Sequence, residues 1–134
     1  SSDHMSTDAS FACVWSDKAT REGLFRSMQA RRTFGATAQI VLKVTAGEHW
    51  MGEIFSTKTM PPIQIEIRGT APIRQVDVLM DGKVQKSFQA SGAEQKVVYE
   101  SDATLAGNHI FFVRLEQTDG NHAWSSPLWV NVKP

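Results

Sequence analysis

The residues of this sequence that could perform chemistry are one cysteine, scattered carboxylates and the three histidines that lie outside the N-terminal SSDHM. His49, His109 and His122 do not have the H-x-H or H-x-x-x-H spacing that brings two imidazoles to one metal ion. Cys13 has no second cysteine to pair with, and its apolar neighbours in FACVW predict a buried small side chain rather than a reactive thiol. The three histidines would be the first residues to replace if catalysis were found.

The carboxylates show no pattern of a catalytic pair. Glu66 and Asp77 lie on neighbouring predicted strands, but each alternates with apolar residues, so both are predicted to point to solvent. The sequence also lacks a nucleophile elbow, a phosphate-binding loop and a dinucleotide fingerprint. We therefore expect no catalytic, cofactor-binding or metal-ligating residue in this chain, and no enzymatic activity of its own.

Tryptophans are the other residues with a chemical use. Trp50 and Trp124 are candidates for stacking against a sugar ring if their indoles are exposed. Trp129 stands between Leu128 and Val130, so alternation turns it away from the core and makes it a candidate interface residue. The favoured interpretation is that the tryptophans fill the core or an interface with a neighbouring domain, and a carbohydrate-binding module is the alternative.

One amphipathic helix is predicted near the N-terminus, within TREGLFRSMQARR. Thr20 is suited to cap it, and Leu24, Phe25 and Met28 form its apolar stripe. Gly23 lowers the helix propensity by about 1 kcal/mol relative to Ala, so the stripe should pack against something. We predict that Leu24, Phe25 and Met28 form an interface. The arginines at 21, 26, 31 and 32 leave an anion-binding face as an alternative.

Short strands are predicted over most of the remaining chain. IQIEIRG alternates apolar and polar residues, and IRQVDVLMDGKVQKSFQ reads as a hairpin whose type I′ turn is formed by Asp81 and Gly82. Val76, Val78, Met80, Val84 and Phe88 are predicted to face inward in that hairpin. These patterns predict a mainly-β, Ig-like antiparallel β-sandwich of about seven to eight strands with one N-terminal α-helix.

Composition limits the partners. The 134-residue chain carries 14 Lys and Arg against 14 Asp and Glu, so its formal net charge is zero. Neither nucleic acid nor a membrane is therefore an expected partner, and no apolar run reaches the ~18 residues of a membrane-spanning helix. The N-terminal SSDHM has the pattern of an affinity-tag remnant, so residues 1–10 are expected to be a tag remnant and a loose N-terminus.

Two segments resemble a known family. VWSDKATREGLFRSMQARRTFGAT, together with QTDGNHAWSSPLWVNV near the end, is similar to the C-terminal region of a large, mostly uncharacterised bacterial family. That family is related to the PHP (polymerase and histidinol phosphatase) metal-dependent phosphoesterases. The sequence departs from the family pattern where Gly35 and Ala36 replace Ala-Thr and where Ala38 replaces a glycine.

The resemblance implies a domain organisation and a function. Residues 11–37 would be a strand and helix left from an upstream barrel domain, and residues 38–134 would be a β-sandwich domain. The divalent metals and their ligands would lie in the upstream barrel, so this chain would be a non-catalytic accessory domain of a PHP-like hydrolase that stabilises the barrel, shapes its site or mediates contacts. The expected partners are the upstream barrel domain and a second copy of the chain.

Overall fold

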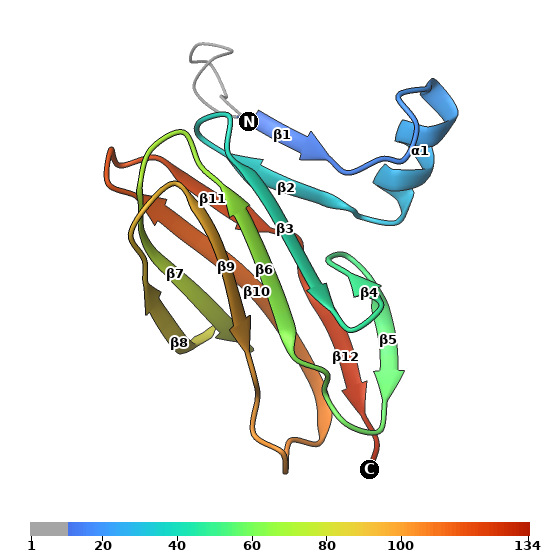
Figure 1. Cartoon of the computed structure of the whole chain (residues 1–134). Coiled ribbons are helices and arrows are strands. Elements are labelled where there is room, and N and C mark those ends of the chain that lie inside the picture. Colours follow the sequence, from blue (N-terminus) through green and yellow to red (C-terminus); the bar gives the residue numbers. More distant parts are fainter. Residues whose placement is uncertain (1–10) are drawn as a thin grey trace.

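The computed structural model describes residues 11–134 and shows an Ig-like β-sandwich with a helix beside its N-terminal strands (Figure 1). The predicted tag remnant at residues 1–10 lies outside the described residues. Helix α1 spans Arg21–Gln29. The strands are β1 (Phe11–Val14), β2 (Thr33–Ala36), β3 (Val41–Ala46), β4 (His49–Trp50), β5 (Ile54–Thr57), β6 (Ile63–Arg68), β7 (Ile73–Met80), β8 (Lys83–Gln89), β9 (Glu94–Tyr99), β10 (Gly107–Gln117), β11 (His122–Ser125) and β12 (Leu128–Val132).

The larger sheet has eight strands and is built around β10. This eleven-residue strand pairs with β7 along one edge, and with β11 and then β12 along the other. β8 extends the sheet beyond β7, β2 and β1 extend it beyond β11, and β5 extends it beyond β12. The predicted antiparallel arrangement holds except for β5 and β12, which run parallel because the chain leaves β5 for the other sheet instead of turning back in a hairpin.

The smaller sheet has four antiparallel strands in the order β4-β3-β6-β9 and crosses in front of the larger one in Figure 1. Short pairings at the ends of both sheets raise the number of strands in the described residues to twelve, against the seven or eight that the sequence predicts. The additional strands, such as the two-residue β4, are too short to produce a detectable alternation.

The core lies between the two sheets and consists of the residues that alternation predicts to face inward. The following are all buried: Ile40, Leu42, Val44, Ile63, Ile65, Ile67, Val76, Val78, Phe111, Val113, Leu115, Leu128, Val130 and Val132. Burial of aliphatic side chains at this density, each contributing roughly 1.5–3 kcal/mol, is the main source of stability in such a sandwich.

The β7–β8 hairpin has the predicted turn but not the predicted packing throughout. Asp81 and Gly82 have φ values of 53° and 83°, as a type I′ turn requires. The prediction that Val84 faces inward is wrong, since this side chain is 47% exposed. A bulge shifts the register so that Lys86 lies opposite Val78 but Val84 lies opposite Leu79. Val84 is thereby turned to the outer face of the sheet.

Helix α1 begins as predicted, because the Thr20 hydroxyl accepts a hydrogen bond from the Gly23 amide at 3.0 Å. The helix ends at Gln29, and Arg31 follows with a φ of 58° that turns the chain into β2. In Figure 1 the helix projects from the ends of β1 and β2, away from the other strands of both sheets. It is also the only helix of the described residues, and it is too short and polar to span a bilayer.

The N-terminal strands are continuous with the sandwich. β2 pairs with β11, and β1 pairs with β2, so residues 11–14 and 33–36 form one side of the larger sheet. The predicted domain boundary at residue 37 therefore falls between two elements of the same fold. The origin of residues 11–37 in an upstream barrel stays a prediction.

Candidate functional site

The three histidines lie apart and each has its own surroundings. The His49 ring stacks on Phe55 with 3.7 Å between centroids, and its Nδ1 lies 3.2 Å from Oε1 of Glu53. His122 is exposed on β11. In the part of the chain that the structure describes, no group of three or more His, Cys, Asp or Glu residues is placed to hold a metal ion.

His109 joins the β7–β8 turn to the start of β10. Its Nδ1 lies 2.7 Å from Oδ2 of Asp81, and its Nε2 lies 2.8 Å from the carbonyl oxygen of Ala106. Both ring nitrogens thus face acceptors, and only the imidazolium form can donate to both. The hydrogen bond to Asp81 raises the pKa of His109, while the same bond lowers the pKa of Asp81. The sequence did not reveal this pair, because its partners lie 28 residues apart.

Cys13 is part of the packing around the core. It is half-buried on β1 and contacts the core cluster. Burial raises the pKa of its thiol, which favours the protonated form of the sulfur.

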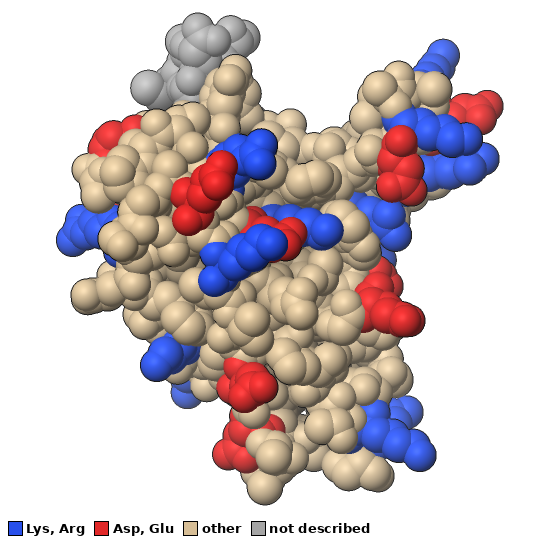
Figure 2. Space-filling view, in the orientation of Figure 1, with Lys and Arg blue, Asp and Glu red and all other residues tan. Residues whose placement is uncertain are grey.

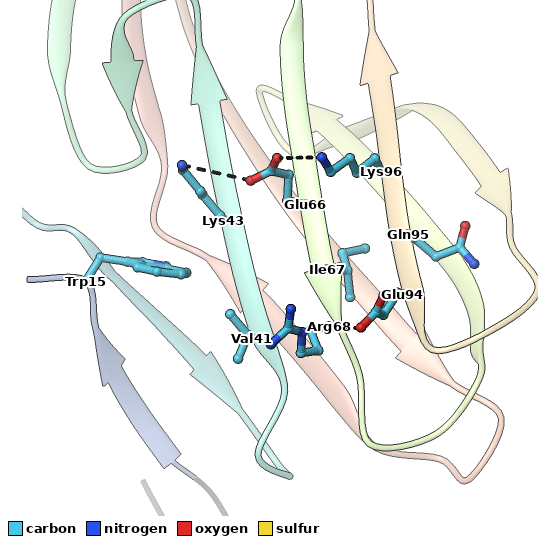
Figure 3. Close-up of a pocket in the computed structure, with 9 residues that line it drawn as sticks. All are labelled: Trp15, Val41, Lys43, Glu66, Ile67, Arg68, Glu94, Gln95 and Lys96. Carbon is cyan, nitrogen blue, oxygen red and sulfur yellow. Dashed lines mark ion pairs between the residues drawn. The ribbon is translucent and has the colours of Figure 1, made fainter.

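The outer face of the smaller sheet carries paired charges. Lys43 and Lys96 lie 3.9 and 3.6 Å from the carboxylate oxygens of Glu66, which stands between them on β6 (Figure 3). Arg68 and Glu94 form a second pair at 3.5 Å. Figure 2 shows red and blue side chains next to one another in the upper and central part of this view. The charges of this face are therefore largely compensated by neighbouring side chains.

Trp50, a candidate for sugar stacking, has cations over its ring. The guanidinium carbon of Arg32 lies 5.2 Å and the ammonium nitrogen of Lys43 lies 4.7 Å from the ring centroid, and Trp15 meets the ring edge-on at 5.9 Å. Nε of Arg32 is buried without a hydrogen-bond partner among the described residues, so the Trp50 ring supplies its electrostatic compensation. These contacts leave little of the indole for a ligand.

Trp124, the other stacking candidate, lies in a groove on the outer face of the larger sheet. Its side chain is 44% exposed. The residues directly opposite one another across five strands are Gly35, Trp124, Arg114, Asp77 and Ser87, in that order. The structure therefore brings an exposed indole next to an ion pair on a single rung of the sheet.

Asp77 corrects a sequence-based prediction. It points to the outer face as alternation requires, but it is buried rather than solvated, with 7% of its surface exposed. Its Oδ1 accepts hydrogen bonds from Gln75 and Ser87, both at 2.7 Å, and its Oδ2 accepts one from Nε of Arg114 at 3.0 Å. Burial alone would raise the pKa of Asp77, but the hydrogen bonds from Ser87, Gln75 and Arg114 outweigh it and lower the pKa.

The predicted interface residues of the helix are exposed. Leu24, Phe25 and Met28 have exposed fractions of 42%, 60% and 57%, and the only buried residue of α1 is Ser27. Trp129, the fourth predicted interface residue, faces outward on β12, with the Arg31 guanidinium 5.5 Å from its ring centroid. Of the four helix-region arginines, Arg31 and Arg32 thus lie over tryptophan rings rather than on a basic face.

No family model matches the sequence. The chain is 25% identical to an uncharacterized protein of Chlamydia muridarum, covering 98% of this chain and 24% of that protein. It is 28% identical to one of Chlamydia pneumoniae, with 87% and 22% covered, and 24% identical to one of Chlamydia trachomatis, with 98% and 24% covered. The chain therefore spans about a quarter of the length of the curated relatives it matches.

Two solved structures overlap loosely with the fold. The fibronectin(III)-like modules of Clostridium thermocellum CbhA share 22% identity over 67% of this chain and 95% of that one, with a TM-score of 0.37. A lytic polysaccharide monooxygenase of Jonesia denitrificans shares 14% identity over 89% of this chain and 76% of that one, with a TM-score of 0.45. At these scores neither structure assigns a function to the chain.

Proposed function

We propose that this chain acts as a non-catalytic accessory β-sandwich domain that docks through α1 onto a preceding domain of a longer polypeptide. The observation that carries this proposal is that the apolar stripe of α1 is exposed and packs on none of the described residues enough to be buried. Leu24, Phe25 and Met28 are 42–60% exposed on a nine-residue helix that contains Gly23. A helix this short is marginal in water without a packed apolar face. Contact with another surface would bury the stripe and stabilise the helix.

The length of the relatives supports an intramolecular partner. The matched chlamydial proteins are about four times as long as the matched segment. A longer polypeptide would therefore contain further domains, and one of them could pack against the apolar stripe of α1. The resemblance to the PHP-like family favours an upstream barrel, with α1 as its last helix.

We further propose that any hydrolysis belongs to the upstream part of such a polypeptide. The divalent metals of a PHP-like parent would there activate water against a phosphate ester. This chain would stabilise that domain or shape access to its site. Hydrolysis of a generic phosphate ester with Mn²⁺ should be found with the longer polypeptide and not with this chain, whereas activity of this chain alone would overturn the accessory role.

Hydrogen exchange tests the docking directly. The backbone amides of α1 should exchange faster in the isolated chain than in the longer polypeptide in which this segment occurs, while those of β10 should exchange alike in both. Phe25→Ser should abolish the difference, and Ile54→Ser, at a side chain 71% exposed outside the helix, should preserve it. Equal exchange of α1 in both proteins would refute the proposal.

Self-association is distinguished in the same experiment. If a second copy covered the stripe, protection of α1 in the isolated chain would rise with protein concentration. That result would replace the upstream domain with a second copy of this chain as the occupant.

A further inference from the structure

The groove on the outer face of the larger sheet is separate from α1 and plays no part in the proposed docking. Its volume is about 490 Å³, within the range of small-molecule sites. The side chains that define it are Gln75, Asp77, Phe112, Arg114, His122 and Trp124. They come from β7, β10 and β11, three neighbouring strands of one sheet, so the floor of the groove is rigid.

Trp124 is held as a flat platform. A Cβ atom placed on Gly35 would lie 3.0 Å from Cε2 of Trp124, 3.1 Å from Nε1 and 3.3 Å from Cζ2. Because Cε2 is a ring-fusion carbon and is the nearest atom, the Gly35 backbone approaches the face of the indole rather than its edge. The backbone of β2 therefore supports one face of the ring. Much of the remainder is open to the groove, consistent with the 44% exposure of the side chain.

The polar groups beside the platform are fixed before any ligand arrives. Nε of Arg114 donates to Asp77, and both carboxylate oxygens of Asp77 are occupied. The Arg114 side chain is nevertheless 51% exposed, and its terminal nitrogens have no hydrogen-bond partner among the described residues. The ion pair with Asp77 fixes the orientation of the guanidinium, so the N–H donors of these nitrogens are held in place before a ligand binds.

The charges of the groove compensate one another. Asp77 neutralises Arg114, and Glu116 lies 3.5 Å from Arg74. An anionic ligand at the terminal nitrogens of Arg114 would be repelled by the carboxylates of Asp77 and Glu116, which line the same groove, and a cation would have to compete with Arg114 for Asp77. The site therefore favours an uncharged ligand with a flat face to stack and hydroxyl groups to accept and donate hydrogen bonds.

We propose that this groove binds an uncharged oligosaccharide, with one pyranose ring stacked on Trp124 and its hydroxyl groups bonded to Arg114 and neighbouring polar side chains. The C–H bonds on the apolar face of a pyranose meet the electron-rich face of the indole. Sugar hydroxyl groups both donate and accept hydrogen bonds. They can accept from Arg114, and they can donate to or accept from Gln75 and His122. A single stacked ring predicts weak binding, with a Kd on the order of 1 mM.

Nitrogen–proton NMR of the four indole groups provides the test. The chain is titrated with the neutral hexasaccharides of cellulose, xylan, mannan, starch and chitin, and with hexagalacturonate as an anionic control. At least one neutral ligand should shift the Nε1–H signal of Trp124. Trp15 is the internal reference, because its Nε1 donates a 2.8 Å hydrogen bond to the Leu42 carbonyl oxygen. This bond does not involve any residue that lines the groove.

Variants assign the effect to the groove. Trp124→Ala should weaken binding at least about tenfold, whereas Phe25→Ala, an exposed aromatic outside the groove, should leave it unchanged. If Trp124→Ala fails to fold, the signal shift in the unaltered protein decides. No shift with any neutral ligand, a response to hexagalacturonate alone, or a shift of another indole with Trp124 unmoved would overturn the proposal. None of these outcomes bears on the docking of α1.

Discussion

Replacing Gly52 by alanine tests how the end of the helix region is attached to the sandwich. Gly52 has a φ of 92°, and an added Cβ would collide with the carbonyl oxygen of Arg31. This obstacle is backbone, so no side-chain rotation relieves it. The Arg31 turn would have to move, and two hydrogen bonds of 2.7 Å would be lost, from Nε of Arg31 to the Gly52 carbonyl and from the Gly52 amide to the Pro127 carbonyl.

The magnitude follows from these contacts. A positive φ costs an alanine about 1–2 kcal/mol. The two hydrogen bonds contribute about 1 kcal/mol each, and the placement of Arg31 over Trp129 about 0.5–1 kcal/mol. Gly82→Ala is the matched control, because Gly82 has a φ of 83° but nothing within 4 Å of an added Cβ. Gly52→Ala should therefore lose roughly 2–3 kcal/mol more of unfolding free energy than Gly82→Ala.

Urea denaturation of both variants measures this difference, and thermal unfolding should show it as roughly a 10 °C larger drop in Tm. Losses that agree within about 0.5 kcal/mol would refute the close approach of the Arg31 backbone to Gly52.

Three further outcomes are expected. Asp77→Asn should lower the unfolding free energy by about 2–3 kcal/mol in urea titrations, because Arg114 loses the carboxylate with which it pairs. Since folding lowers the pKa of Asp77, this difference in unfolding free energy should be present above pH ~4 and vanish as the pH falls through the folded-state pKa. The pKa of His109 is raised by Asp81, so the stabilisation that His109→Gln removes should be complete below pH ~6.5 and disappear as the pH rises through the folded-state pKa, which paired Tm measurements from pH 5 to 9 would reveal. Phe25→Ser should change the unfolding free energy of the isolated chain by less than about 0.5 kcal/mol by the same urea assay, because this side chain is 60% exposed.

Local pattern determined much of what could be predicted. The alternation of Ile63, Ile65 and Ile67 predicted the buried face of β6, and Asp81-Gly82 predicted the turn type of the β7–β8 hairpin, since both depend on residues close in sequence. The fold class followed from these strand and turn patterns along the chain.

Properties set by register between distant strands could not be predicted. Alternation placed Asp77 on the outer face correctly, but its burial depends on Arg114 and Ser87 arriving from the two neighbouring strands. The cations over Trp50 and the glycine behind Trp124 are likewise contributed by segments far away in sequence. Sequence reasoning could therefore name Trp124 as a candidate but could not show which polar side chains surround it.

The pairing of β2 with β11 has a consequence for synthesis of the chain. The hydroxyl groups of Thr33 and Ser126 are joined across 93 residues, and the same segments exchange main-chain hydrogen bonds. While the ribosome makes the intervening strands, the edge of β2 that will pair with β11 has no partner, and the apolar stripe of α1 lies in the connection between β1 and β2. Strand β2 is thus synthesised well before its partner β11, and during this interval its unpaired edge exposes the nascent protein to misassociation or to capture by chaperones.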